Sequence, residues 1–182
     1  MNMALLKDVS LTGRIAYAIM CVEKYVTAKF PDERWKLVFD PFWEICQSRE
    51  WDTWANKALE YIPEFLLEFA DYESSNFEFI SKDDYLKLKE LYTRIDTDVV
   101  NGLLKRIRDI EEFYCYSSID GIGQESLDYI GEIVSTLERE KIDLPDPELV
   151  SFSKFSAEDG WGSPFDGTKL SIVLVHDNGG EK

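Results

Sequence analysis

The sequence predicts a mostly α-helical protein, a single-domain irregular helical bundle that ends in a short β-hairpin or an extended tail. Its 182 residues suit one domain and are too few for two ordinary ones. Hydrophobic residues make up 45% of the chain and aromatic residues 14%, which is enough to fill a core. Apolar side chains recur every three or four positions over most of the first 141 residues, the period of an amphipathic helix. We therefore expect one domain over residues 1–182, helical over 1–144, with an extended segment over 145–182 packed on it.

The first half of the chain is divided into helices by its prolines. One helix is expected over Leu5–Phe30 and a second over Asp32–Gln47, where Pro41 should kink the helix or split it. A third helix is expected over Ser48–Ile62, capped by its first residue. Pro63 then either breaks this helix or occupies the first turn of a new one.

The second half shows the clearest helical pattern. After a polar connector, Asp71–Ile80, the pair Ser81 and Asp84 resembles a capping box and predicts the start of a helix. Two further helices are expected over Asp96–Tyr116 and Glu125–Lys141. The helices come in rough pairs about forty residues apart, so a short stack of helical repeats is the alternative to an irregular bundle.

The C-terminal segment changes in character, because residues 151–182 are rich in Gly, Ser and Asp. The run Leu170–Val175 is apolar and partly β-branched, and it lies between turn residues, which predicts a strand. A lone strand needs a partner, and we expect one around Leu149–Phe155 in a hairpin on the helices. Trp161 and Phe165 are its expected anchors.

Charge is the unusual feature of this composition. The chain has 36 acidic and 20 basic residues, a formal net charge of −16 and an isoelectric point near 4.4. Such a charge repels nucleic acid and anionic lipid and attracts basic partners, although it can also serve solubility alone. No run approaches about 18 apolar residues, and the N-terminus lacks the apolar core of a signal peptide. We expect a cytoplasmic protein that binds neither nucleic acid nor membrane; the oligomeric state is left open.

Patterns for catalysis and metal binding are weak. The three cysteines are widely spaced and His176 is the only histidine, which argues against a disulfide framework and a zinc site. Gly121 and Gly123 follow a helix and predict a turn rather than a dinucleotide site. Asp96 and Asp98 could chelate a divalent cation, but acids are also favourable at a helix start. We predict no enzyme activity, no catalytic residue, no metal and no cofactor.

One acidic strip is the best candidate for a binding surface. Residues 50–84 hold ten acidic side chains and two basic ones. Spacings of four, four and three would place Glu60, Glu64, Glu68 and Asp71 on one face of a continuous helix. Like charges at these spacings cost about 0.2–0.5 kcal/mol per pair, so the strip fits a surface that awaits a basic partner. The alternative is an ordinary solvated face interrupted at a proline.

Two more residues complete the candidate partner-binding set. Glu73 lies close to the strip in the sequence, and Trp54 adds an aromatic side chain of the kind that is favoured at binding hot spots. The alternative for Trp54 is a place in the core, since a bundle of this size needs large side chains.

Three segments of the chain carry a family resemblance. They are LTGRIAYAIMCVEKY at Leu11–Tyr25, a Trp-x-x-x-x-Asp-Pro-Phe-Trp run at Trp35–Trp43, and GWGSPF at Gly160–Phe165. In these segments the chain resembles the helical immunity proteins of bacterial polymorphic and contact-dependent toxin systems. The resemblance implies a small cytosolic inhibitor that occludes a cognate toxin domain, has no enzymatic activity and is encoded beside the toxin. Many such toxins are nucleases with basic clefts, which an acidic inhibitor would suit as a mimic of nucleic-acid charge.

The leading hypothesis is therefore an immunity protein that binds a basic toxin domain through acidic helix faces. A helical protein-interaction adaptor unrelated to toxins is the first alternative, and a metal-dependent enzyme that uses carboxylates is the second. The sequence does not identify the toxin or its activity.

Overall fold

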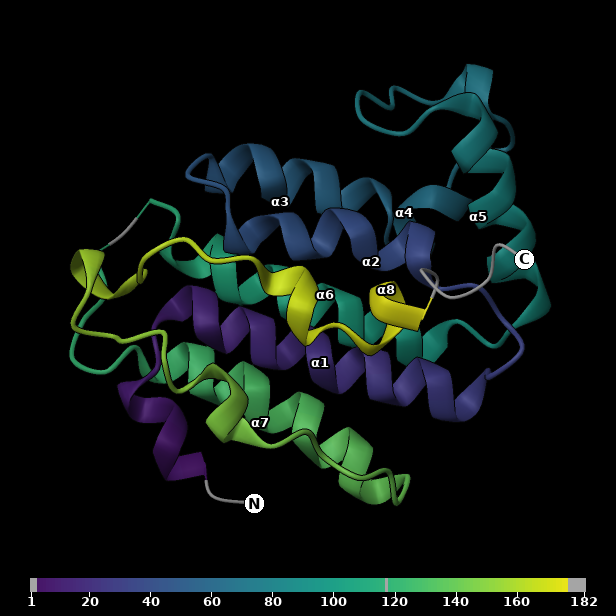
Figure 1. The fold of residues 1–182 in the computed structure, drawn as a ribbon. Helices are drawn as coiled ribbons and strands as arrows, with labels where there is room; N and C mark the ends of the chain where they lie inside the picture. Colours follow the sequence, from purple (N-terminus) through teal and green to yellow (C-terminus); the bar gives the residue numbers. More distant parts are fainter. Residues whose placement is uncertain (1–2, 117, 177–182) are drawn as a thin grey trace.

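In the computed structural model, the described residues, 3–116 and 118–176, form a single all-α domain (Figure 1). Its eight α-helices are α1 (Leu11–Lys29), α2 (Lys36–Trp43), α3 (Trp51–Glu60), α4 (Pro63–Leu67), α5 (Lys82–Arg94), α6 (Asp98–Tyr114), α7 (Gln124–Arg139) and α8 (Ile172–His176). Six 3-10 segments accompany them: η1 (Met3–Asp8), η2 (Glu44–Cys46), η3 (Tyr72–Ser74), η4 (Pro147–Val150), η5 (Glu158–Gly160) and η6 (Gly167–Leu170).

Helix α1 is the centre of the bundle. It packs against α2, α6, α7 and α8, which surround it (Figure 1). Ser10 caps its first turn, where its Oγ accepts a hydrogen bond from the Gly13 amide at 3.1 Å. The sequence predicted an amphipathic helix here, but α1 is buried on nearly every face, Arg14 and Glu23 included. The residues before Ser10 form the separate segment η1 rather than its first turns.

This hub arrangement excludes the helical-repeat alternative. In a repeat stack each unit contacts only its neighbours along the chain. Here α1 contacts α2, the next helix, and also α6, α7 and α8, which come much later. The irregular bundle is therefore confirmed.

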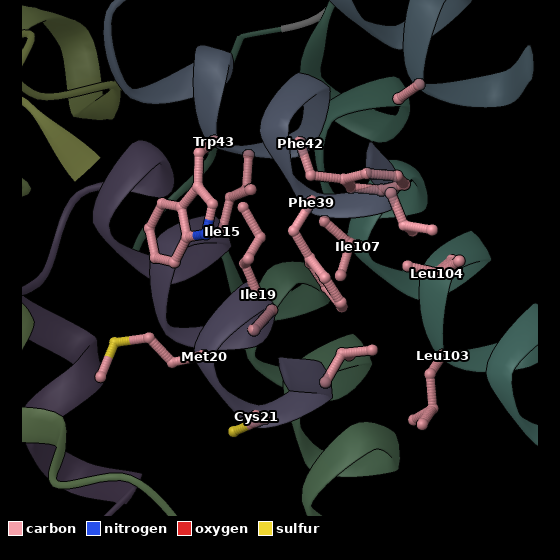
Figure 2. Close-up of a cluster of buried hydrophobic side chains, with 14 of the residues drawn as sticks. Ile15, Ile19, Met20, Cys21, Phe39, Phe42, Trp43, Leu103, Leu104 and Ile107 are labelled. Atoms are coloured by element: carbon pink, nitrogen blue, oxygen red, sulfur yellow. The ribbon is translucent and has the colours of Figure 1, made fainter. Parts of the chain in front are cut away.

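The core is built where α1, α2 and α6 meet. Trp43 and Phe39 of α2 lie beside Ile15 and Ile19 of α1, Phe42 extends to the other side, and Leu104 and Ile107 of α6 complete the cluster (Figure 2). All seven side chains are almost completely buried. Burying a large apolar side chain of this kind is worth about 1.5–3 kcal/mol, so this meeting point supplies much of the stability.

Most helix boundaries follow the local signals in the sequence. Pro41 lies inside α2, and the predicted second helix is split two residues later, where α2 ends at Trp43 and η2 begins. Pro63 occupies the first turn of α4 after the extended residue Ile62, which confirms the second of its two expected roles. Ser81 caps α5, since its Oγ accepts from the Asp84 amide at 3.1 Å.

The remaining helix boundaries agree less evenly. Helices α6 and α7 lie within two residues of their predicted ranges at each end. Ser48 is not the N-cap of α3: Glu50 holds that position, and the Ser48 Oγ accepts from the Glu50 amide just before the helix.

The expected C-terminal hairpin is wrong. The predicted strand Leu170–Val175 instead ends η6 and forms most of α8. Among the described residues, the one isolated β-bridge joins Val9 to Lys154. The physical cause is Glu23, whose carboxylate accepts from the Ser171 hydroxyl at 2.5 Å and from the Ile172 amide at 2.8 Å. These bonds hold the first turn of α8 on α1. Of the two forms expected for the C-terminal segment, a hairpin or an extended tail packed on the helices, the described residues show the second.

The two expected anchors of this segment do hold it in place. Trp161 stacks on Trp51 with ring centroids 3.8 Å apart, and the Phe165 amide donates to the Cys46 carbonyl at 2.8 Å. Between them, Gly162 adopts a φ of +83°, and a Cβ atom there would lie 2.3 Å from the Ser10 Oγ. Only glycine fits this approach of the segment to the start of α1.

A buried arginine joins the N-terminal segment η1 to the turn before α7. Arg14 of α1 lies with its guanidinium among the carbonyls that close η1 and the turn before α7. It donates to Leu6 O at 2.9 Å, Lys7 O at 2.9 Å, Ile122 O at 2.7 Å, Gly123 O at 3.0 Å and Ser126 Oγ at 2.8 Å. One side chain thus satisfies acceptors from segments more than 100 residues apart.

Within residues 3–116 and 118–176, no helix is both long enough and apolar enough to cross a membrane.

Candidate partner-binding surface

The acidic strip predicted from the sequence is not a continuous helix face. The chain leaves helical geometry at Ile62, so Glu60 ends α3 and Glu64 begins the separate helix α4. Glu60 is 5% exposed. Its carboxylate accepts from the amides of Glu78, Phe79 and Ile80 at 2.7–2.9 Å. This carboxylate holds the connector before α5 and is closed to a partner, so its predicted role is wrong.

The other strip residues have separate surroundings. Glu64 forms an ion pair with Lys105 at 2.9 Å, and this hydrogen bond, with a further one from Asn101, holds the pKa of Glu64 below its usual value. Asp71 caps η3, where its Oδ1 accepts from the Ser74 amide at 2.8 Å. The contacts that Glu64 and Asp71 make within the chain explain why acidic residues stand at these positions, without a binding partner.

The last three predicted residues also differ from one another. Glu68 is exposed just after α4. Glu73 forms an ion pair with Lys82. Trp54 is 3% exposed and donates from Nε1 to the Pro41 carbonyl at 2.9 Å, so it belongs to the core, the alternative given for it. Of the six candidates, Glu68 alone combines exposure with no hydrogen bond or ion pair in the described residues.

A different surface combines a pocket, aromatic side chains and exposed carboxylates, which the strip does not. At one end of the bundle, the start of α3, the chain after α6 and the segment around η5 come together, at the left of Figure 1. They enclose an open pocket of about 840 Å³. We call this region the aromatic end and define it as the following residues: Trp51, Asp52, Tyr116, Ile119, Phe155, Glu158, Asp159 and Trp161.

Stacked rings and an ion pair build the wall of the pocket. Trp51 and Trp161 lie nearly parallel, 10° apart. Arg49 reaches across from the start of α3 to Glu158 at 2.7 Å and to the Gly162 carbonyl at 3.4 Å. These contacts join the pocket segment to α3 over more than 100 residues of sequence.

The backbone of this segment is strained. Glu158 and Asp159 have φ values of +49° and +52°, in the left-handed region that non-glycine residues seldom adopt. Each such residue costs on the order of 1 kcal/mol, and strained residues of this kind are concentrated at binding sites. Both residues are exposed and line the pocket.

An exposed aromatic side chain and a buried carboxylate adjoin the pocket. Tyr116 is 89% exposed, and the charge of Asp52 acts on it, on Cys115 and on Glu111. Glu111 is fully buried, and no N–H or O–H donor reaches either carboxylate oxygen; the weak S–H donor of Cys115 lies beside it. Burial raises the pKa of Glu111 to about 7. Trp51 Nε1 is likewise buried without an acceptor.

Two other surface grooves each contain at least one basic side chain that is already paired with acidic neighbours. The groove between α2 and α5, about 600 Å³, is lined by Arg94, which pairs with Glu33 and Glu90. The groove between α6 and α7, about 470 Å³, is lined by Arg106, which pairs with Glu132.

The aromatic end does not offer the parts of a familiar catalytic site. Burial raises the pKa of the Cys115 thiol to about 11 and that of Cys21 to about 12, so both remain protonated and weakly nucleophilic at neutral pH.

The Asp98 amide donates to the Asp96 carboxylate at 3.2 Å, the helix-start role expected for this pair. Within the described residues, no three His, Cys, Asp or Glu side chains converge as metal ligands do. His176 is the last residue of α8. Stacking, apolar contact and attraction of cations are what this surface can provide.

The sequence held only a partial signal for this surface. The pocket wall includes part of the GWGSPF segment, which was noted for its resemblance and as a source of anchors. Trp51, Tyr116 and Asp159 lie far apart in the chain and share no spacing, so their convergence depends on the tertiary fold. Comparison of the chain with protein-family models, with curated proteins and with solved structures finds no match.

Proposed function

We propose that this chain is an immunity protein, which binds a cognate bacterial toxin domain in the cytoplasm and neutralises it by occlusion. The observation that carries the proposal is the charge surplus. Only 20 basic side chains are present for 36 acidic ones, so at least 16 carboxylates have no cation of their own, however the side chains are arranged. A surface with this surplus attracts basic proteins at long range and speeds their association.

The distribution of structure and charge supports binding over catalysis. The segments that resemble immunity proteins form α1, α2 and the loop packed on them, so the resemblance concerns the framework of the fold. A basic nuclease domain is the kind of toxin that fits, because its cleft is built to receive the negative charge of nucleic acid.

Coexpression with the product of the adjacent gene tests this function. Bacteria that express the neighbouring protein alone should stop growing, and expression of this chain with it should restore growth. The two purified proteins should form a complex that weakens at about 1 M salt, where the Debye length falls to about 3 Å. A neighbouring protein that is harmless and does not bind would contradict the proposal.

The two alternatives give different results in the same experiments. An adaptor unrelated to toxins would bind some other protein and would leave the growth of toxin-expressing cells unchanged. A carboxylate enzyme that needs Mg²⁺ or Mn²⁺ would bind the metal alone in a calorimetric titration, whereas the proposed inhibitor gives no heat of binding.

A further inference from the structure

We propose that the partner docks on the aromatic end, and that a lysine or arginine side chain of the partner enters the pocket beside Trp51, Phe155 and Trp161. This inference rests on the proposed function, because it assigns a surface and a mode of contact to the same partner. It replaces the acidic strip, whose carboxylates are buried, paired or dispersed.

The pocket has the size and lining that a cationic side chain needs. Its volume of about 840 Å³ is within the usual range for ligand sites, about 300–1,000 Å³. Trp51, Phe155 and Trp161 line it with aromatic rings. One face of each ring is already covered, because Trp51 and Trp161 stack on each other and the Arg14 guanidinium lies 4.9 Å from the centre of the Phe155 ring, so a partner's cation would meet the remaining faces and edges. Such rings attract lysine and arginine through their negative faces, and tryptophan is among the residues most enriched at binding hot spots.

Charge at the mouth of the pocket favours a cation over a neutral group. Glu158 and Asp159 are exposed in its lining, and Asp52 is exposed next to Trp51 in the sequence. Arg49 is the single cation in ion-pair contact with any of these three within the described residues. Two carboxylates therefore stay uncompensated. Arg49 compensates Glu158 alone, at 2.7 Å, and the internal example of a cation on one of these rings is Arg14, whose guanidinium lies 4.9 Å from the centre of the Phe155 ring.

Unsatisfied polar groups set this end apart from the rest of the molecule. Among the buried side-chain nitrogen and oxygen atoms that the structure describes, the Glu111 carboxylate has only the weak S–H donor of Cys115 beside it and Trp51 Nε1 has no acceptor. Each such group costs about 1–3 kcal/mol, and a folded protein keeps such costs mainly where function requires them. A cation brought to this end would stabilise the ionised form of Glu111.

Two kinds of substitution test the docking surface. Tyr116→Ala removes a side chain that is 89% exposed, so the fold should tolerate it. The double variant Asp52→Asn and Asp159→Asn removes two exposed charges, and asparagine suits the left-handed backbone at position 159. With the purified product of the adjacent gene as the probe, each variant should weaken binding roughly tenfold or more.

Matched control variants lie at the other end of the bundle in Figure 1. Leu86→Ala removes a side chain that is 54% exposed on α5, and Glu138→Gln with Asp143→Asn removes the same charge near the end of α7. Both controls should bind as the unchanged chain does. If the unchanged chain binds and the aromatic-end variants bind equally well, the docking surface is wrong and the proposed function stands. If the unchanged chain does not bind, both proposals fail together.

Discussion

Buried carboxylates in the interior of the bundle differ from the one beside the aromatic end in their hydrogen bonding. In the interior, the Glu23 carboxylate accepts from Trp43 Nε1, the Ser171 hydroxyl and the Ile172 amide, and Glu60 accepts three backbone amides. At the aromatic end, Glu111 is as deeply buried but has no N–H or O–H donor. A satisfied buried charge fixes distant segments of the chain to one another. A buried carboxylate without such donors, like that of Glu111, joins no segments and stays buried because the rest of the fold holds it there. We take it to mark the neighbouring surface as one suited to binding.

The satisfied charges also explain how a chain with long irregular connections keeps one structure. Arg14 fixes η1 to the turn before α7, Glu23 fixes the C-terminal segment to α1 and α2, and Glu60 fixes the connector before α5. Each provides several directional bonds between segments that have no strand pairing. The predictions below test this division between framework and surface, from the largest expected effect to the smallest.

Arg14→Ala should have the largest effect. The substitution leaves the carbonyls of η1 and of the turn before α7 without their donor in a buried site, at about 1–3 kcal/mol for each unsatisfied group. We expect the free energy of unfolding to fall by about 4 kcal/mol, as measured by urea denaturation. Arg139→Ala, at an exposed arginine of α7, is the matched control and should leave it unchanged. A small loss for Arg14→Ala would show that the segments are held by apolar contacts instead.

The sequence alone could place the helices but not these charges. In Leu11–Lys29 the apolar spacing predicts an amphipathic helix and does not mark Arg14 and Glu23 as buried, because a helical period records only neighbours along the chain. Their partners are up to 149 residues away, and only those partners make burial tolerable. The cap at Ser81 was predicted correctly, and a helix start was one of the two roles expected of Pro63, because a cap and a helix start depend on a few adjacent residues.

The two failures at the strip and the tail have the same origin. The spacing of Glu60 and Glu64 fits a helix face, but the extended residue Ile62 separates them, and a network of backbone amides buries one of them. The apolar run Leu170–Val175 favours a strand by composition, yet the carboxylate of Glu23 holds it as a helix start. Tertiary contacts override a local preference of this size.

Glu111→Gln should change the dependence of stability on pH. In the unfolded chain Glu111 ionises near pH 4.5, whereas its folded pKa is about 7. Between these values the folded state holds the extra proton, so stability falls as pH rises through this window and stays low above it. At about 1.4 kcal/mol per pKa unit, glutamine should recover about 2–3 kcal/mol at about pH 8 and little at about pH 4.

Urea denaturation across this pH range measures that effect. Glu90→Gln on α5 is the control, since Glu90 is an exposed glutamate that pairs with Arg94 at 2.7 Å and does not act on Glu111. It should keep the slope of the unsubstituted chain. An equal slope in both variants would mean that Glu111 is ionised in the folded protein at all these pH values, and the contrast with Glu23 would disappear.

Glu23→Gln should have a smaller and more local effect. One amide oxygen remains to accept, but the NH₂ group faces N–H or O–H donors, which leaves about one buried hydrogen bond unmade at about 1–2 kcal/mol. The C-terminal segment should then detach more often, and trypsin should cut faster after Lys169 in η6. Glu138→Gln on the exposed side of α7 should leave the cutting rate unchanged. Unchanged cutting in Glu23→Gln would show that apolar contacts alone hold α8.

Glu64→Gln should have the smallest effect, and it separates a paired surface charge from a framework charge most directly. Glu64 and Lys105 form an ion pair at 2.9 Å, but their side chains are 63% and 47% exposed, so solvent screens the attraction. We expect no measurable change in the melting temperature, whereas Glu60→Gln, four residues earlier, should lower it clearly because it disturbs three buried amide contacts. If both variants have the same melting temperature, the burial of a carboxylate in this fold does not determine how much it contributes to stability. If Glu64→Gln alone weakens the complex with the partner, the docking surface extends to α4 and the acidic strip regains a member.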